Sequence, residues 1–188
     1  MKLEAAISNA NQRAGDLHGL RLREDNRSRL AASLFAIAQQ HQSAILILLS
    51  NQPPVEATAF SLLRLLIETT VRGAWASHCA TEAQLKNIVD GTQKQIDMAS
   101  VFTSVERSLS KDAEHNIDAK SLYDNHWKVL SAYTHGYEQQ VLRWMVTKDI
   151  EPNYPVEEIE ELIYLSDLTA KLAFVCTKAL AQELTNEC

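Results

Sequence analysis

The sequence has few of the residues that interrupt regular structure. Five glycines and four prolines occur among 188 residues, whereas an all-β protein with many short strands needs frequent turn residues. No stretch shows the alternation of apolar and polar residues that is typical of a half-buried strand. We therefore expect an all-α fold without a sheet, in which residues 1–188 form a single helical-bundle domain of about six helices.

Cysteine is scarce as well, and long apolar runs are missing. The three cysteines, Cys79, Cys176 and Cys188, show no paired spacing, which indicates free thiols in a reducing compartment. The most apolar run, residues 44–49, is far shorter than the ~20 residues of a transmembrane helix. The N-terminus has no apolar signal-peptide segment. These features predict a cytoplasmic protein that does not associate with membranes.

Motifs for metals and nucleotides are also absent. The six histidines form no HxxxH or HExxH pair and no cluster with cysteine, so we expect no metal and no cofactor. Neither GxxxxGK[ST] nor GxGxxG occurs, which excludes the nucleotide-binding folds that depend on these loops. The lack of a GxSxG turn argues against a serine hydrolase.

The charge is predominantly acidic and unevenly distributed. The formal net charge is −6, with 10 basic and 8 acidic residues in positions 1–94 but 8 basic and 16 acidic residues in positions 95–188. The molecule as a whole therefore does not attract nucleic acid by its net charge. Five arginines lie close together near the N-terminus and form either a solvated face with ion pairs or a local anion-binding patch: Arg13, Arg21, Arg23, Arg27 and Arg29.

Apolar periodicity and capping residues predict six helices. Their approximate ranges are 3–22, 26–50 with Asn26 as N-cap, 55–79 with Pro54 in the first turn, 81–109, 119–147 with a bend at His135, and one that begins at Pro155. Thr81 and Gln84 form a capping box at the start of the fourth. The third helix is apolar around most of its circumference, which is typical of a central, buried helix.

The third helix also carries charged residues among its apolar ones. Arg64, Glu68 and Arg72 are four positions apart and therefore lie on one face as i,i+4 neighbours. We call these residues the arginine–glutamate ladder. Glu68 can pair with both guanidinium groups and leave a net charge of +1. The ladder is either a structural network that fixes the position of the helix or an anion-binding site that faces a cleft.

The fifth helix has a matching polar stripe. Ser131, His135, Gln139 and Arg143 share one of its faces because they are spaced by four residues. Histidine is the side chain whose ordinary pKa, about 6.5, suits proton transfer near neutral pH. A single histidine can also be only a packed or hydrogen-bonding residue. We expect the third and fifth helices to pack together, so that the ladder and the stripe share a polar cleft.

Two segments resemble a known family. Residues 63–75 contain Arg64, Glu68 and Arg72, and residues 127–143 contain Trp127 and His135 followed by a glycine. These segments resemble an uncharacterised family of small bacterial all-helical proteins, a domain of unknown function, whose members have an Arg-x-x-x-Glu-x-x-x-Arg helix and a later Trp…His-Gly helix. That resemblance implies an all-helical fold and carries no activity.

The chain is more distantly similar to the HEPN superfamily, whose helical bundles often act as metal-independent ribonucleases in toxin and phage-defence systems. Their motif is an arginine followed four to six residues later by a histidine, and Arg72 with His78 has this spacing. Gly73 stands where the superfamily usually has Asn or Asp, and no arginine lies four to six residues before His135. The resemblance implies that histidine exchanges a proton with the ribose 2′-OH and that arginine stabilises the phosphorane.

Two functional hypotheses follow. The first is an HEPN-like bacterial defence or toxin–antitoxin protein that binds or cleaves RNA. In it, Arg72 and Arg64 hold phosphate, His135 moves the proton and Glu68 orients the arginines, while Ser131, Gln139 and Arg143 complete the cleft. The alternative is a non-enzymatic, homodimeric helical module, such as an antitoxin, an adaptor or a small-anion sensor, in which the ladder is structural. The acidic C-terminal half, which repels RNA, favours this alternative.

Overall fold

The structure is a computed structural model that describes residues 1–92, 94, 96–109, 119–135, 138–146 and 148–185. Within these ranges the chain forms eight helices and no strand, so the all-α prediction is confirmed, but the helices are more numerous than the six expected. They are α1 (Leu3–Leu17), α2 (Asn26–Ser50), α3 (Glu56–His78), α4 (Glu82–Val89), α5 (Met98–Leu109), α6 (Ala119–Thr134), α7 (Glu138–Trp144) and α8 (Val156–Thr185).

The helix expected over residues 81–109 is two helices. The capping box of Thr81 and Gln84 is present at the start of α4. α4 ends at Val89, and Gly91 follows with a φ of +70°, a left-handed conformation that glycine adopts readily. α5 begins one residue after Asp97, whose carboxylate accepts a hydrogen bond of 2.9 Å from the backbone N–H of Ser100. The end of α4 and the start of α5 are therefore both marked by individual residues, Gly91 and Asp97.

The other boundaries differ by smaller amounts. The helix expected over residues 119–147 is divided into α6 and α7 beside His135, while the adjoining Gly136 lies outside the described residues. α1 ends at Leu17, before Gly19 with its φ of +79°. Asp25, rather than Asn26, caps α2, and Pro54 precedes the N-cap of α3 instead of lying in its first turn.

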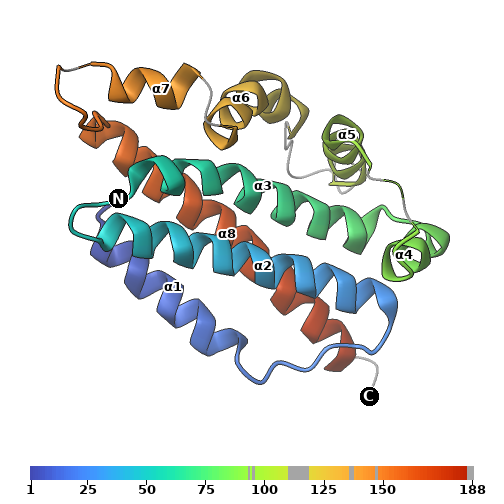
Figure 1. The fold of residues 1–188 in the computed structure, drawn as a ribbon. Coiled ribbons are helices and arrows are strands. Elements are labelled where there is room, and N and C mark those ends of the chain that lie inside the picture. Colours follow the sequence, from blue (N-terminus) through green and yellow to red (C-terminus); the bar gives the residue numbers. More distant parts are fainter. Residues whose placement is uncertain (93, 95, 110–118, 136–137, 147, 186–188) are drawn as a thin grey trace.

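The helix α3 is the centre of the bundle, as its sequence predicts. Along the chain from 59 to 77, every residue is buried or half-buried. α2 runs antiparallel to α3 and contacts it along its length, α8 crosses both on one side, and α5 and α6 lie across the other side of α3 (Figure 1). α1 packs on α2 and α8. The residues of the ladder therefore lie on a helix that contacts four others, α2, α5, α6 and α8.

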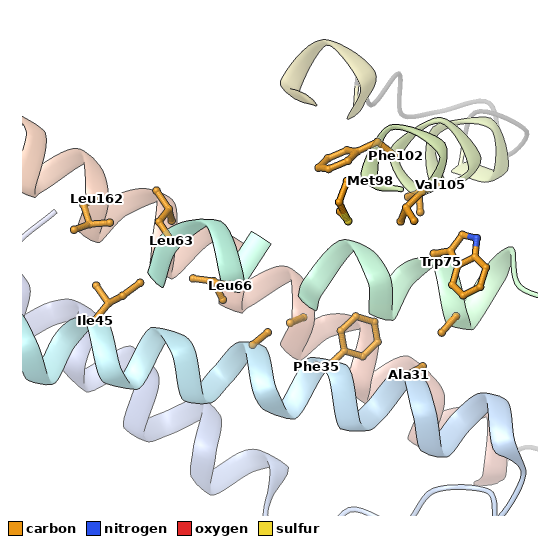
Figure 2. Packing of buried hydrophobic residues seen from close by; sticks show 14 of the residues in the cluster. Ala31, Phe35, Ile45, Leu63, Leu66, Trp75, Met98, Phe102, Val105 and Leu162 are labelled. Atoms are coloured by element: carbon orange, nitrogen blue, oxygen red, sulfur yellow. The ribbon is translucent and has the colours of Figure 1, made fainter. Parts of the chain in front are cut away.

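Apolar side chains from three other helices meet on the faces of α3. In the view of Figure 2, Phe35 and Ile45 of α2 lie below α3, Leu162 of α8 lies beside Leu63 of α3, and Met98 of α5 points toward α3 from above. A Cβ atom at Gly73 would lie 2.5 Å from Cε1 of Phe35. The glycine after Arg72 is thus a requirement of helix packing.

Among the described residues, α2 is the helix long and apolar enough to span a membrane, with a mean hydropathy of 1.3 over its most apolar window. The short run 44–49 had not indicated this. Nine α2 residues are nevertheless buried within the bundle, and the helix contacts α1, α3, α4 and α8. These contacts are those of a core helix.

Two of the five N-terminal arginines, Arg13 and Arg27, make contacts that join helices. Arg13 is buried, and its Nη2 donates to Oε1 of Gln42 at 2.9 Å and to Oδ1 of Asp167 at 2.7 Å. Arg27 donates to the carbonyls of Ala76 and Ala80 and to the carboxylate of Glu82 at the end of α3 and the start of α4. Both arginines therefore tie helices together, and neither contributes to an anion-binding patch.

Two of the cysteines fall in the described ranges. Cys79 and Cys176 are both half-buried free thiols, and burial raises the pKa of the Cys176 thiol. Cys188 lies outside the described residues. A buried thiol with a raised pKa is a poor nucleophile, so Cys176 is a packing residue.

Candidate functional site

The arginine–glutamate ladder forms as its spacing predicts. The three side chains are half-buried on one face of α3, with 17–20% of each exposed. Nε of Arg72 lies 3.0 Å from Oε1 of Glu68, whereas Nη2 of Arg64 lies 3.9 Å from the other carboxylate oxygen. Glu68 therefore neutralises Arg72 more than Arg64.

Arg64 is the ladder residue that meets the histidine. Its Nη1 lies 3.1 Å from Nε2 of His135, and its guanidinium carbon lies 4.8 Å from the centre of the Trp127 ring. Because a guanidinium group has only donors, this contact is a hydrogen bond in the tautomer in which Nε2 of His135 accepts and Nδ1 carries the proton. The tryptophan supports the flat face of Arg64 by a cation–π contact.

Hydrogen bonds near the end of α6 fix the position of His135. The hydroxyl of Ser61 on α3 donates to the carbonyl of Tyr133 at 2.9 Å, and the hydroxyl of Thr134 donates to the carbonyl of Ser61 at 3.3 Å. Gln140 on α7 donates to Oγ of Ser61 at 2.6 Å. These bonds hold the end of α6 against the first half of α3, where His135 reaches Arg64.

Arg64 retains donors for a further partner. Its Nε is buried and makes no hydrogen bond within the described part of the chain. Such groups are rare in folded proteins and cost free energy unless a ligand or water satisfies them. His135 is exposed next to it. The pair therefore combines a partly unsatisfied cation with an accessible proton acceptor.

The remaining predicted residues lie elsewhere. Arg72 is eight positions from Arg64, about 12 Å along the helix axis, and its Nη2 donates to the carbonyl of Ile96 at 3.2 Å. The hydroxyl of Ser131 donates within α6 to the carbonyl of Trp127 at 2.7 Å. Arg72 and Ser131 are therefore not part of the contact that joins Arg64 to His135.

Gln139 and Arg143 line a cavity of about 350 Å³ on the side of α6 and α7 that faces α8. Nη2 of Arg143 lies 2.5 Å from the carboxylate of Glu158. Burial lowers the pKa of Arg143, but the hydrogen bond and the charge of Glu158 outweigh burial, and the net pKa is raised. Arg143 is thus a permanently charged residue in a structural pair.

The spacing of Arg72 and His78 does not produce a site. His78 is the exposed last residue of α3. Six positions at 3.6 residues per turn place it on a different face from Arg72. The HEPN-like spacing is therefore present in the sequence, while the histidine that contacts an arginine is His135.

The sequence did not indicate the roles of three residues that lie near Arg64 and Arg143. Trp127 packs at the edge of the core against Phe102, and Arg64 stacks on its ring. Tyr154 stacks on Phe60, and burial raises its pKa to about 12. Glu158, in the first turn of α8, pairs with Arg143.

A metal site is not apparent in the described residues. Within those ranges, no three side chains of histidine, cysteine, aspartate or glutamate come together in a way that could hold an ion. The contact between Arg64 and His135 places a cation that can bind an anion beside a side chain that can exchange a proton.

Comparison with curated proteins and with solved structures gives no match. A family model matches residues 35–187, a range that contains the ladder and His135. The resemblance to an uncharacterised all-helical family is thereby confirmed. The chain belongs to a family of unknown function (DUF6988).

Proposed function

We propose that the chain is an HEPN-like bacterial defence or toxin–antitoxin protein that binds RNA where α3 meets α6. Arg64 holds a backbone phosphate, and His135 exchanges the proton of the neighbouring ribose hydroxyl. The observation that carries the proposal is the 3.1 Å contact between Arg64 and the exposed His135. Arg72 acts indirectly, because it holds Glu68 and leaves most of the charge of Arg64 available.

The contact itself suggests how the pair would work. The nitrogen of His135 that accepts from Arg64 is the one that would take the proton of the 2′-OH. When a phosphate oxygen binds the guanidinium group of Arg64, it replaces Nε2 of His135 as the hydrogen-bond acceptor. Nε2 is then available to take the proton. The 2′ oxygen then attacks phosphorus while Arg64 stabilises the charge on the phosphorane, and the bond from phosphorus to the 5′ oxygen breaks as this oxygen takes a proton from water. The reaction gives a 2′,3′-cyclic phosphate and needs no metal.

RNA binding at this place must be local, because the molecule has a net charge of −6. The ladder contributes a charge of +1, and its residues are half-buried, where screening by salt is weaker than at a fully exposed site. Few phosphates can be contacted there. We therefore expect a shallow dependence of RNA affinity on salt concentration, in contrast to proteins with many phosphate contacts.

The test uses a fluorescent single-stranded RNA, with binding followed by anisotropy and cleavage followed by gel electrophoresis. Arg64→Gln should weaken binding, whereas His135→Gln should retain binding and lose about 10²–10⁴-fold in cleavage rate. His78→Gln is the matched control, since His78 is exposed on another face of α3. Cleavage by His135→Gln at the wild-type rate would contradict the enzymatic role. Binding unchanged in Arg64→Gln would contradict the site.

A second candidate is the non-enzymatic, homodimeric module. The observation that favours it is an exposed apolar stripe on α8, where Leu168, Leu172 and Val175 have 51–53% of their surfaces exposed. A patch on one helix can pack against the same patch of a second copy across a two-fold axis. In this case the ladder and the Arg143–Glu158 pair serve stability, and RNA is not cleaved.

A further inference from the structure

A groove runs along the side of the bundle where α3 lies between α6 and α8. It consists of two adjoining cavities of about 350 Å³ and about 340 Å³. They share Leu63 of α3, Val129 and Leu130 of α6, and Glu161 and Leu165 of α8, and the whole lining belongs to the described part of the chain. We propose that this groove binds a basic amphipathic helix of a partner protein, with the apolar face of that helix toward α3.

The apolar surface of the groove has the spacing that an amphipathic helix requires. Leu63, Ile67 and Val71 line it from α3 at intervals of four residues and therefore follow one another along the helix. On α8, Leu168 and Leu172 form part of the opposite wall and are half-exposed. Side chains at positions i, i+3, i+4 and i+7 of a partner helix fit into such a groove.

The length of the groove fits a helix of three to four turns. Its lining extends over residues 60–71 of α3 and 158–172 of α8, which correspond to about 17 Å and 21 Å at the rise of an α-helix. A partner helix of about 11–14 residues has this length. A small molecule is usually enclosed by its site, whereas Val129 and Leu168 leave 46% and 51% of their surfaces open to solvent.

The charge of the groove favours a basic partner. Its lining contains three charged residues, Arg143, Glu158 and Glu161. Arg143 and Glu158 neutralise each other. The carboxylate of Glu161 is exposed and has no ion-pair or hydrogen-bond partner among the described residues. Because Glu161 lines both cavities, a lysine or arginine near the middle of the partner helix would meet it, whereas RNA or an anionic lipid would be repelled.

The groove is separate from the proposed RNA site. Arg64 and His135 line neither cavity, and Trp127, on which Arg64 stacks, packs against α5. Failure of RNA binding therefore leaves this proposal untouched, and the reverse also holds. A partner helix would cover Leu168 and Leu172, so it would exclude a second copy of the chain from the same stripe of α8.

The test uses the full chain and two synthetic helical peptides of about 14 residues, which match the groove in length. One has leucine on one face and lysine on the other, and the second has glutamate in place of every lysine. Isothermal titration calorimetry at about 0.15 M salt, where long-range attraction is screened, measures their affinities. We expect a saturable 1:1 complex with the leucine–lysine peptide and at least about tenfold weaker binding of the leucine–glutamate peptide.

Substitutions locate the complex. Glu161→Lys should weaken binding of the leucine–lysine peptide by about tenfold, because repulsion replaces attraction. Glu160→Lys is the matched control, since Glu160 is exposed outside the lining and the change in net charge is the same. Val129→Lys should also weaken binding by about tenfold or more, because it places a charge on the apolar wall. Its control is Val141→Lys, at an exposed valine of α7 outside the groove.

Four results would overturn the proposal. Absence of saturable binding, or equal affinity for the two peptides, would show that the groove does not select a basic helix. Equal losses in Glu161→Lys and Glu160→Lys would show that only the net charge matters. Wild-type affinity in Val129→Lys would place the peptide elsewhere.

A wild-type dimer that Val129→Lys converts into a monomer in sedimentation velocity would show that a second copy occupies the groove. Circular dichroism verifies the fold of each variant. If Val129→Lys does not fold, the comparison of the two peptides and of the two glutamate variants still decides.

Discussion

At the scale of single residues, Gly73 shows how one position reverses an ordinary rule. Alanine normally stabilises an exposed helix position by about 1 kcal/mol relative to glycine. A Cβ at Gly73 would lie 2.5 Å from the ring of Phe35, which is fully buried. We therefore expect Gly73→Ala to lower the free energy of unfolding by about 1–3 kcal/mol, as measured by urea denaturation.

The control for this prediction is Gly15 of α1. A Cβ there meets nothing within 4 Å, so Gly15→Ala should raise the free energy of unfolding by up to about 1 kcal/mol. Changes of the same sign in the two variants would show that Phe35 does not restrict the residue at position 73.

His41 of α2 should make stability depend on pH. Burial lowers the pKa of His41 below its ordinary 6.5. Just below pH 6.5 the unfolded chain therefore binds a proton that the folded chain does not, and stability falls as the pH falls. The free energy of unfolding should drop more between pH 7.5 and pH 5.5 in the wild type than in His41→Gln. Equal drops would exclude the contribution of His41.

The residues of the candidate site could be predicted only in part. The spacing of Arg64, Glu68 and Arg72 indicated the ladder, and His135 stood out by its chemistry. Which arginine meets the histidine depends on how far α6 is shifted along α3. Hydrogen bonds of Ser61, distant in sequence from α6, set that shift, and no local pattern reveals them.

At the scale of helices, the ion pair of Arg13 and Asp167 connects α1 with α8, and Gln42 joins it from α2. Both charged side chains are mostly buried, with 8% and 13% exposed. Removal of one partner leaves an uncompensated charge, so Asp167→Leu should lower the free energy of unfolding by about 3–5 kcal/mol.

The double variant Arg13→Met, Asp167→Leu tests whether the cost comes from the unpaired charge. We expect it to recover much of the lost stability, because a buried ion pair and an apolar pair of similar volume are often close in free energy. A double variant as unstable as the sum of the single variants would show that the two side chains act independently.

The helices themselves were more predictable than their ends. Apolar periodicity identified α2, α3 and α8, and the Thr81–Gln84 capping box located the start of α4. The break between α4 and α5 was missed although Gly91 and Asp97 both mark it. The caps contribute about 1 kcal/mol each, and a pattern of hydrophobicity does not register them.

At the scale of the whole molecule, the outer face of α8 departs from the expected pattern. Leu162 and Ile163 are buried, whereas Leu168, Leu172 and Val175 are half-exposed. At 3.6 residues per turn the two sets lie on opposite sides of the helix. The apolar residues of α8 therefore form two stripes, and the other helices of the bundle cover one stripe more fully than the other.

This face leads to a prediction about self-association. If the homodimer forms through the exposed stripe of α8, Leu172→Lys should convert it into a monomer, because a charge would be buried in the interface. Sedimentation velocity at several concentrations measures this change. Ile47→Lys is the matched control, since Ile47 is an exposed apolar residue of α2. A wild-type chain that sediments as a monomer at all concentrations would contradict the dimer.

The enclosure of α3 has a consequence for hydrogen exchange. A helix whose residues from 59 to 77 are all at least half-buried, with neighbours on every side, exposes its amides to solvent only when the bundle opens globally. The ladder then persists in the partly opened forms of the molecule and is lost only on global unfolding. A ligand on α3 would slow the exchange of every amide that exchanges through global unfolding, including amides far from its own binding site.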